Sequence, residues 1–133
     1  MTEYESLTIE RDGGVAWIVL DNEDQRNAVT LGSANELIDA ATSLGEDPEA
    51  RGIVLTHSGQ FFGAGADLTQ FDGHDPEGDA TKIRQLAGRI HEAVIQLHQT
   101  DTPVIGGVSG IAAGAGFSLA LAPDLLVLSE NAR

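Results

Sequence analysis

The sequence predicts an α/β protein, and three observations lead to this class. Short apolar runs typical of buried strands alternate with longer segments in which apolar residues recur at helical spacing. A hairpin signal opens the chain, and glycine-rich stretches follow two later strands. With 133 residues, the chain is long enough to bury a core, and we expect a single domain over residues 1–133.

The first elements predicted are two strands, residues 5–11 and 15–20, joined as a hairpin. The sequence between them, Asp12-Gly13-Gly14, is a strong turn signal because glycine adopts the positive φ angles that tight hairpin turns need. A polar loop over residues 21–28 follows. We therefore expect an antiparallel pair at the start of the chain.

A helix is predicted next, with Thr30 as its N-cap and its end within residues 45–48, Gly-Glu-Asp-Pro. Its apolar residues recur at intervals of three and four, which is helical spacing. A short buried strand over residues 53–55 follows the helix. A glycine-rich loop, residues 58–67, then follows the strand.

The second half of the chain repeats the strand and helix alternation. Residues 72–79 contain four acids, two glycines and a proline, and they predict a loop. A helix with one apolar face over residues 83–97 leads to a buried strand, residues 104–108. A glycine-rich loop and a helix come next, and the last strand starts at residue 124 and runs to residue 128.

The charge of the chain is strongly negative. Asp and Glu number 21 against 7 Lys and Arg, the net charge is −14, and Lys82 is the only lysine. Because the acids are dispersed along the chain, we expect adaptation to high salt, where screening weakens self-repulsion. A moderately acidic protein from an ordinary environment is the alternative. Either way, the sequence lacks the basic surface that nucleic-acid binding requires.

The sequence offers no cysteine and no signal for secretion or membrane insertion. The absence of cysteine excludes disulfides and thiolate catalysis. Its N-terminus has no basic and apolar leader pattern, and no run approaches the apolar length of a membrane span. We expect a cytoplasmic protein with no membrane partner.

Two glycine-rich loops, GAGAD at 63–67 and GAGFS at 114–118, follow predicted strands. Such loops can present backbone N–H groups to a negatively charged ligand. A dinucleotide-binding pattern needs a third glycine, but Leu68 and Leu119 stand there, and the Gly-Lys-Ser/Thr of a phosphate loop is missing. Small residues that merely let a helix pack closely on a strand are the alternative. Two loops of this kind favour a shared site.

The chain resembles the enoyl-CoA hydratase/isomerase (crotonase) superfamily over essentially its whole length. The matching stretches are VAWIVLDNEDQRNAV at 15–29, RGIVLTHSGQFFGAGADL at 51–68 and TPVIGGVSGIAAGAGFSLALAPDLLV at 102–127. The resemblance implies a crotonase-like spiral of ββα units, an acyl-CoA thioester as substrate and a reaction through an enolate. Family domains are about twice this length, so it also implies a fold that is incomplete at the C-terminus.

The resemblance assigns the oxyanion hole to the backbone N–H groups of Ala66 and Ala115. One such donor contributes roughly 3–4 kcal/mol to transition-state stabilisation. The resemblance places Arg26 near the CoA phosphates, although Arg26 could instead be a solvated loop residue. It makes Asp67 a CoA-site residue that we expect to cap a following short helix. The other positions that it assigns to CoA binding are Ala28, Ala64, Gly65, Leu68 and Gly114.

Ser118 departs from the hydratase pattern, in which the resemblance implies a glutamate that helps to activate water. Serine is not basic at neutral pH without a partner, and no histidine is placed beside Ser118 by a motif. We therefore expect Ser118 to be a small filler or a local hydrogen bonder, and an isomerase to fit better than a hydratase. The acid/base residue is left unassigned. Asp124 is expected to be a structural acid at the start of the last strand.

Metals and cofactors are not expected. His91 and His98 could share a face of one predicted helix, but no third ligand accompanies them, so we predict surface histidines and no metal site. The acyl-CoA thioester is the substrate, and no separate cofactor is implied.

Two functions remain open at this point. The first is an enoyl-CoA isomerase or hydratase, and the alternative is a non-catalytic CoA-binding or scaffold protein that lacks the acid/base carboxylates. The resemblance implies a homo-oligomer, since family members form trimers or hexamers. A complementary C-terminal chain is the other partner that we expect.

Overall fold

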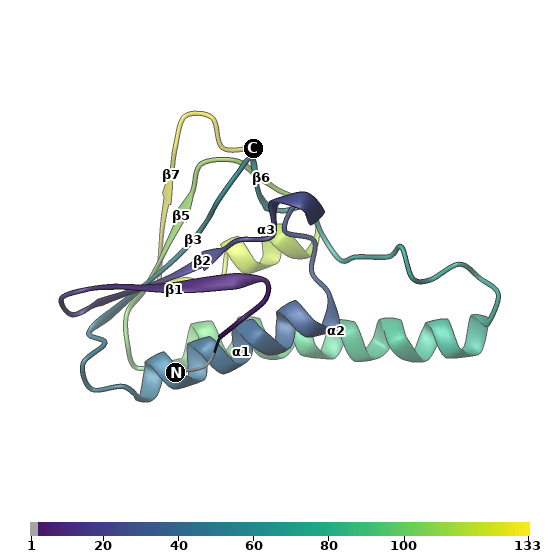
Figure 1. Ribbon diagram of the computed structural model, residues 1–133, viewed down its shortest axis with the longest axis horizontal. Helices are drawn as coiled ribbons and strands as arrows, with labels where there is room; N and C mark the ends of the chain where they lie inside the picture. Colours follow the sequence, from purple (N-terminus) through teal and green to yellow (C-terminus); the bar gives the residue numbers. More distant parts are fainter. Residues whose placement is uncertain (1–2) are drawn as a thin grey trace.

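The computed structural model describes residues 3–133, in which a five-stranded sheet covers two long helices (Figure 1). A second, two-stranded sheet and a short helix lie beside them. In chain order the elements are β1 (Leu7–Asp12), β2 (Val15–Leu20), η1 (Glu23–Gln25), α1 (Leu31–Glu46), β3 (Gly52–His57), β4 (Phe61–Gly63), α2 (Pro76–Gln99), β5 (Val104–Val108), β6 (Ile111–Ala112), α3 (Ala115–Ala120) and β7 (Leu125–Leu128).

Three successive strand–strand–helix units make up this order, followed by β7. In the second and third units, the first strand joins the large sheet, whose order is β1-β2-β3-β5-β7, and the second strand joins the small sheet β4-β6. The chain thus winds repeatedly from one sheet to the other. The predicted α/β class and the spiral of ββα units are both confirmed.

The hairpin at the start of the chain is the only antiparallel pair of the large sheet within residues 3–133. Asp12 pairs with Val15, so the turn consists of Gly13 and Gly14, and Gly13 has a φ of 60°. The remaining neighbours in this sheet, β2-β3, β3-β5 and β5-β7, are parallel. Parallel strands end at the same edge, which brings the loops after β3 and β5 together.

The predicted start of the first helix is confirmed in detail. The Thr30 hydroxyl accepts a hydrogen bond from the Ser33 amide at 3.0 Å, and the Ser33 hydroxyl accepts one from the Thr30 amide at 2.9 Å. This reciprocal capping box satisfies two amides at the helix terminus. The helix ends at Glu46, within the predicted stop segment.

The predicted loop over residues 72–79 is wrong in its second part, because α2 begins at Pro76. Asp75 caps the helix by accepting a hydrogen bond from the Gly78 amide at 3.2 Å. Proline is favoured at the first helical position, where its missing N–H costs nothing. Glu77 and Asp79 lie in the first turn, where the helix dipole favours negative charge. The residues that suggested a loop therefore form a helix start, and α2 extends beyond the sheet (Figure 1).

Two short strands were not predicted. The strand β4 lies within the expected glycine-rich loop, and β6 lies in the segment expected to be loop and helix. They contain 3 and 2 residues, so neither is long enough to show the alternation that marks a strand in a sequence. They nevertheless form the small sheet that holds the two glycine-rich turns.

The main core lies between the large sheet and the helices α1 and α2, and it extends to β4. The largest completely buried side chains are those of Phe62, Ile18, Ile53, Leu55, Leu97 and Val104. The expectation of largely buried strands fails for β7, because all four of its residues are exposed, with Leu125 at 65% and Val127 at 62%. Since β7 is the edge strand of the sheet, it presents an apolar edge to its surroundings.

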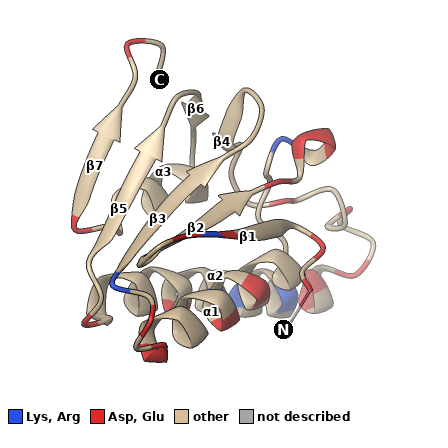
Figure 2. Ribbon diagram, turned by 60° about the vertical axis from the view of Figure 1, so that its left-hand side comes forward, with Lys and Arg blue, Asp and Glu red and all other residues tan. Residues whose placement is uncertain are grey.

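Most strands of the large sheet carry no charged residue. Strands β2, β3, β5 and β7 contain no Lys, Arg, Asp or Glu, whereas acids collect on α1, α2 and the connecting loops (Figure 2). None of the helices within residues 3–133 has both the length and the apolar character that crossing a membrane requires.

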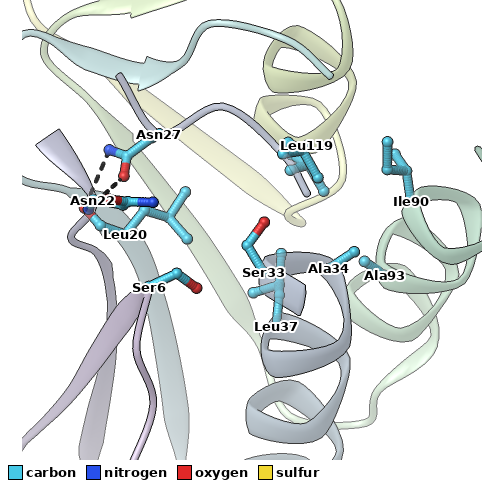
Figure 3. A pocket seen from close by; sticks show the side chains of 11 residues that line it. Ser6, Leu20, Asn22, Asn27, Ser33, Ala34, Leu37, Ile90, Ala93 and Leu119 are labelled. Atoms are coloured by element: carbon cyan, nitrogen blue, oxygen red, sulfur yellow. Dashed lines mark hydrogen bonds between the residues drawn. The ribbon is translucent and has the colours of Figure 1, made fainter. Parts of the chain in front are cut away.

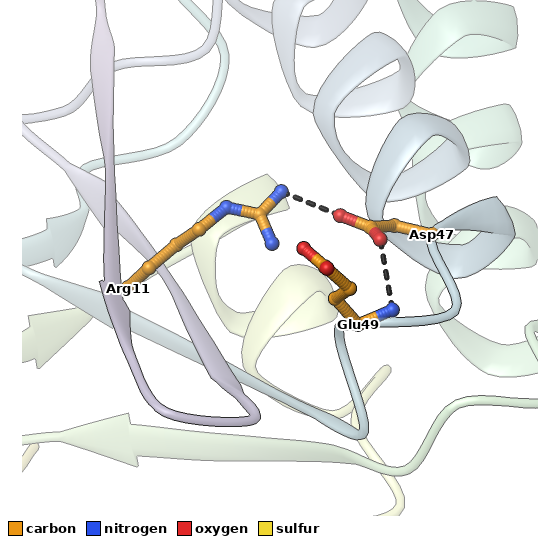
Figure 4. A network of polar contacts seen from close by, with 3 residues as sticks. All are labelled: Arg11, Asp47 and Glu49. Atoms are coloured by element: carbon orange, nitrogen blue, oxygen red, sulfur yellow. Dashed lines mark hydrogen bonds and ion pairs between the residues drawn. The ribbon is translucent and has the colours of Figure 1, made fainter.

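An ion pair fastens the hairpin to the end of α1 (Figure 4). The Arg11 guanidinium lies 2.7 Å from the Asp47 carboxylate, and the second oxygen of Asp47 accepts a hydrogen bond from the Glu49 amide at 2.9 Å. The Glu49 amide, followed by Arg11, lowers the pKa of Asp47 below its ordinary value of 3.8. The pair is exposed, so it contributes orientation more than stability.

Candidate active site

The two glycine-rich segments are pressed against each other, backbone to backbone. A methyl group added at Gly63 would lie 2.8 Å from the Cα of Gly116, and one added at Gly116 would lie 2.3 Å from the carbonyl oxygen of Gly63. The same carbonyl accepts a hydrogen bond from the Ala113 amide at 2.9 Å. These glycines therefore allow α3 to pack closely on β4, as the packing alternative for the small residues predicted.

A second pair of glycines, Gly65 and Gly114, orients the backbone that follows each of the two glycine-rich turns. Gly65 and Gly114 have φ angles of 111° and 55°, which other residues rarely adopt, and a methyl group at Gly114 would lie 3.5 Å from the Cα of Gly65. Ala66 and Ala115 directly follow these two residues. The left-handed turns thus set the directions of two neighbouring backbone amides.

Neither of these two amides is used by the fold. Val29 donates to the Gly65 carbonyl at 2.7 Å and accepts from the Asp67 amide at 2.8 Å, so the intervening Ala66 N–H points away from Val29. Ala115 is the first residue of α3, where helical amides have no intrahelical partner. Within residues 3–133, neither N–H donates a hydrogen bond. The two glycine-rich turns, which are in backbone contact, therefore each carry one N–H group, of Ala66 or Ala115, that is free to bind a ligand.

A third segment, residues 26–29, runs alongside the first glycine-rich turn. The Arg26 carbonyl accepts a hydrogen bond from the Ala64 amide at 3.1 Å, and Val29 forms the bridge to Ala66. Ala28 is half-buried between these contacts. The structure therefore brings Arg26, Ala28, Ala64 and Gly65 together, and their assignment to CoA binding stays a prediction.

Asn27 holds this segment in place, and sequence reasoning gave it no role. It is the one buried polar residue within residues 3–133, and its side-chain oxygen accepts from the Asn22 amide at 2.8 Å. Its side-chain nitrogen donates to the carbonyls of Phe61, at 2.8 Å, and Leu20, at 3.2 Å. Its φ of 51° is a left-handed conformation that asparagine tolerates well. This tolerance of asparagine for left-handed backbone is the sequence feature that could have pointed to a role for Asn27.

Arg26 is exposed on an open groove of about 320 Å³. Its guanidinium carbon lies 5.7 Å from the centre of the Phe61 ring, a cation–π distance. The side chain makes no ion pair within the described part of the chain. A role for Arg26 in CoA binding stays a prediction.

The expected capping role of Asp67 is wrong, because no helix begins after it. Its carboxylate instead accepts hydrogen bonds from the Thr69 hydroxyl at 2.7 Å and the Thr69 amide at 3.0 Å, which closes a turn. The hydroxyl bond, followed by the amide bond, lowers the pKa of Asp67. This carboxylate is thus held as an anion. Leu68 beside it is 57% exposed, and its CoA role stays a prediction.

An apolar groove of about 590 Å³ opens between α2 and α3, beside Ala115. Ser118 is exposed on its wall, one helical turn after Ala115. Ser118 therefore borders a space large enough for an acyl chain, and its expected role as a small filler or a local hydrogen bonder stays a prediction. The residues that line the groove are Ala87, Ile90, His91, Val94, Ile95, Ala115 and Ser118.

A smaller cavity, shown in Figure 3, lies between α1, α2 and the end of β2, and Ile90 of α2 lines both this cavity and the groove. It measures about 30 Å³, and Ser6, Asn22, Asn27 and Ser33 are the polar residues among its otherwise apolar lining. This volume accommodates a water molecule and excludes an acyl chain. The cavity is therefore not a substrate site.

Asp124 has the structural role that was predicted for it. Its carboxylate accepts the Val104 amide at 2.8 Å, which joins the starts of β7 and β5. As for metals, residues 3–133 contain no group of three or more His, Asp or Glu side chains placed to hold an ion.

The fold and the site together define an α/β protein of ββα units that presents two backbone amides from contacting glycine turns beside an apolar groove. The chain belongs to the enoyl-CoA hydratase/isomerase family, whose model matches residues 10–133. This confirms the resemblance that the three sequence stretches carried.

Similar proteins agree with this assignment. A probable enoyl-CoA hydratase, echA8, from Mycobacterium bovis is 32% identical over 130 residues, which cover 98% of this chain and 48% of the relative. A carnitinyl-CoA dehydratase from Salmonella enteritidis is 35% identical and covers 96% of this chain and 47% of the relative. The crystal structure of an enoyl-CoA hydratase from Bacillus anthracis has a TM-score of 0.87 and 31% identity, covering 96% of this chain and 49% of that structure. The chain spans about half the length of the curated relatives it matches.

The contact between the glycine turns gives a stability prediction. We expect Gly63→Ala to lower the free energy of unfolding by about 1–3 kcal/mol or more, because the new methyl group meets the backbone of Gly116 and not a movable side chain. The matched control is Gly88→Ala on α2, where nothing lies within 4 Å of the new methyl group. That variant should gain about 0.5–1 kcal/mol from helix propensity. Urea unfolding measures both, and a Gly63→Ala protein as stable as wild type would contradict the packing role.

Proposed function

We propose that this chain forms the oxyanion hole and the CoA-binding part of an acyl-CoA enzyme that works through an enolate. The observation that carries the proposal is the pair of unused amides, Ala66 and Ala115, on two turns in backbone contact. Membership of the enoyl-CoA hydratase/isomerase family supports it.

The chemistry depends on where negative charge develops. When a base removes a proton from the carbon next to a thioester, the electron pair of the broken C–H bond delocalises onto the thioester oxygen. Fixed donors that meet this oxygen stabilise the enolate without reorganising during the reaction. The amides of Ala66 and Ala115 supply such donors, and their alanine methyl groups leave room for the thioester.

The thioester position orients the rest of the ligand in this proposal. The acyl chain enters the apolar groove beside Ala115, and the CoA moiety runs toward Arg26 along residues 26–29. Because the chain carries a net charge of −14, an unpaired arginine is a local attraction for phosphate in an otherwise repulsive field.

Within this family we favour double-bond isomerisation over hydration. Ser118 lines the groove where the resemblance to hydratases implies a glutamate, and a serine hydroxyl cannot activate water by taking its proton. Isomerisation needs only proton transfer at carbon. The names of the similar proteins refer to hydratase and dehydratase activities, so this preference rests on Ser118 alone.

Calorimetry and a turnover assay test the proposal together, in molar salt because we expect salt adaptation. Wild type should bind an acyl-CoA and convert a 3-enoyl-CoA. Arg26→Gln should weaken CoA-thioester binding about tenfold, or about 1.4 kcal/mol, and leave binding of the matching pantetheine thioester unchanged. Arg11→Gln, which removes the cation paired with Asp47, is the control and should leave both affinities unchanged. Binding without turnover would favour the non-catalytic alternative, and no binding would exclude CoA recognition.

We also propose that the chain assembles through the apolar edge formed by β7 and α3. Leu125, Val127 and Leu128 are exposed on the edge strand, and Phe117 on α3 and Leu121 just after it are more than half exposed beside the strand. The opposite edge strand, β1, carries charged residues that discourage pairing, whereas β7 carries none. Exposed apolar patches of this kind mark interaction surfaces.

Light scattering tests the assembly. We expect the chain to form oligomers, and Val127→Lys should shift the distribution toward monomer by placing a charge on the edge. The control, Ile9→Lys on the opposite edge strand, should leave the oligomer in place if the variant folds. A wild-type protein that stays monomeric at high concentration would contradict the proposal.

A further inference from the structure

The contact between β3 and β5 continues through side chains after the main-chain pairing has ended. The paired residues of β3 end at Leu55, before the end of the strand. The Thr56 hydroxyl then donates to the Gly107 carbonyl at 2.8 Å. His57, the last residue of β3, accepts the backbone amide of Ser109 at its Nε2 atom, 3.0 Å away. The sequence assigned no role to this histidine.

The hydrogen bond from Ser109 fixes the state of the imidazole ring. A backbone amide can only donate, so His57 must present a lone pair at Nε2, which makes it the neutral tautomer with its proton on Nδ1. Nδ1 lies 3.3 Å from the Ser58 carbonyl, which is the acceptor that this tautomer needs. The completely buried Phe62 ring meets the imidazole at nearly a right angle, with 5.6 Å between the ring centres. These contacts hold His57 in the form that accepts a hydrogen bond.

His57 and its partner lie where the chain twice leaves the large sheet for a glycine-rich turn. The segment after β3 forms β4 and leads to Ala66, and the segment after β5 forms β6 and leads to Ala115. The two segments touch at once, because a methyl group added at Gly110 would collide with the Gln60 carbonyl and lie 3.1 Å from the imidazole ring. The hydrogen bond between Ser109 and the imidazole thus joins both segments at their starts.

The main chain alone specifies the register of these segments weakly. The strands β4 and β6 have 3 and 2 residues, and their ladder contains two pairs with an irregularity between them. Glycine-rich strands are prone to slip in register. The contact of Gly63 with Gly116 sets how closely the turns approach, but it presents no side chain that would resist sliding along the strands. A slip of the β6 segment would displace Ala115 relative to Ala66.

We propose that His57 is a positioning residue for the oxyanion hole, an inference that rests on the proposed function. Its Nε2 lone pair accepts the Ser109 amide and thereby holds the segment that leads to Ala115 in register with the segment that leads to Ala66. In this role the imidazole touches no substrate and transfers no proton. Loss of the acceptor leaves the Ser109 amide without its partner, which favours movement of the segment.

The tautomer is tested on the wild-type protein. In mildly alkaline solution, where imidazole is neutral, the 15N shifts of His57 should show a protonated Nδ1 and an Nε2 that carries no proton. A proton on Nε2 would overturn the proposal, whatever the variants show.

Two substitutions separate the hydrogen bond from the bulk of the ring. His57→Gln keeps an acceptor, since the glutamine side-chain oxygen can take the place of Nε2 while its nitrogen donates to the Ser58 carbonyl. His57→Leu has no acceptor. We expect amide hydrogen exchange at Ser109 to quicken about tenfold in His57→Leu, as for the loss of one hydrogen bond, and to stay near the wild-type rate in His57→Gln. Fast exchange in both variants would overturn the acceptor role.

NMR shifts of the Ala66 and Ala115 amides report the positioning itself, without a ligand. They should move in His57→Leu and return to the wild-type values in His57→Gln. Thr56→Val is the matched control, because it removes the side-chain hydrogen bond to Gly107 inside β5. It should lower the urea midpoint and leave both amide shifts unchanged. Amide shifts that stay in place in His57→Leu, or that move equally in Thr56→Val, would overturn the positioning role.

Infrared spectroscopy of bound butyryl-CoA, labelled with 13C at the thioester carbonyl, relates the positioning to the reaction. The lowering of the C=O stretch by wild type should shrink in His57→Leu and recover in His57→Gln. If His57→Leu lowers the stretch as much as wild type, the role of His57 is overturned while the proposed function stands. Absence of any acyl-CoA binding by wild type would overturn the proposed function and this inference together.

Discussion

The contact between two glycine backbones is the constraint on which the site depends. Gly63, at the end of β4, lies so close to Gly116, in α3, that neither position has room for a methyl group. Close packing of this kind cannot relax cheaply, because the atoms that would have to move are backbone atoms of the small sheet and of a helix. The contact therefore fixes one glycine turn relative to the other, and with it the spacing of the Ala66 and Ala115 amides.

The rest of the fold supports this contact from two directions. Parallel pairing of β3 with β5 brings both turns to one edge of the large sheet, and the core beneath holds the strands at that edge. Asn27 ties the neighbouring loop to β4 through a fully hydrogen-bonded buried amide, which is costly to disrupt. Rigid elements thus carry a site made of main-chain groups, which need no particular side chain.

The sequence predicted the features that depend on local patterns. The Gly13-Gly14 hairpin and the Thr30 cap follow from turn and capping chemistry, and the proposal of Ala66 and Ala115 as oxyanion donors came from resemblance. The strands β4 and β6 were too short to show a period, and the start of α2 was hidden by a loop-like composition. That His91 and Ser118 line one groove could not be predicted, because the groove depends on how two helices pack.

Isotope-edited infrared spectroscopy of a bound acyl-CoA tests the central claim most directly. With a 13C label at the thioester carbonyl, the C=O stretch reports hydrogen bonding to the oxygen itself. Two amides aimed at this oxygen polarise the carbonyl, so the stretch should fall to lower frequency on binding to wild type. A bound thioester whose stretch matches that of the free ligand in water or lies above it would contradict an oxyanion hole at Ala66 and Ala115.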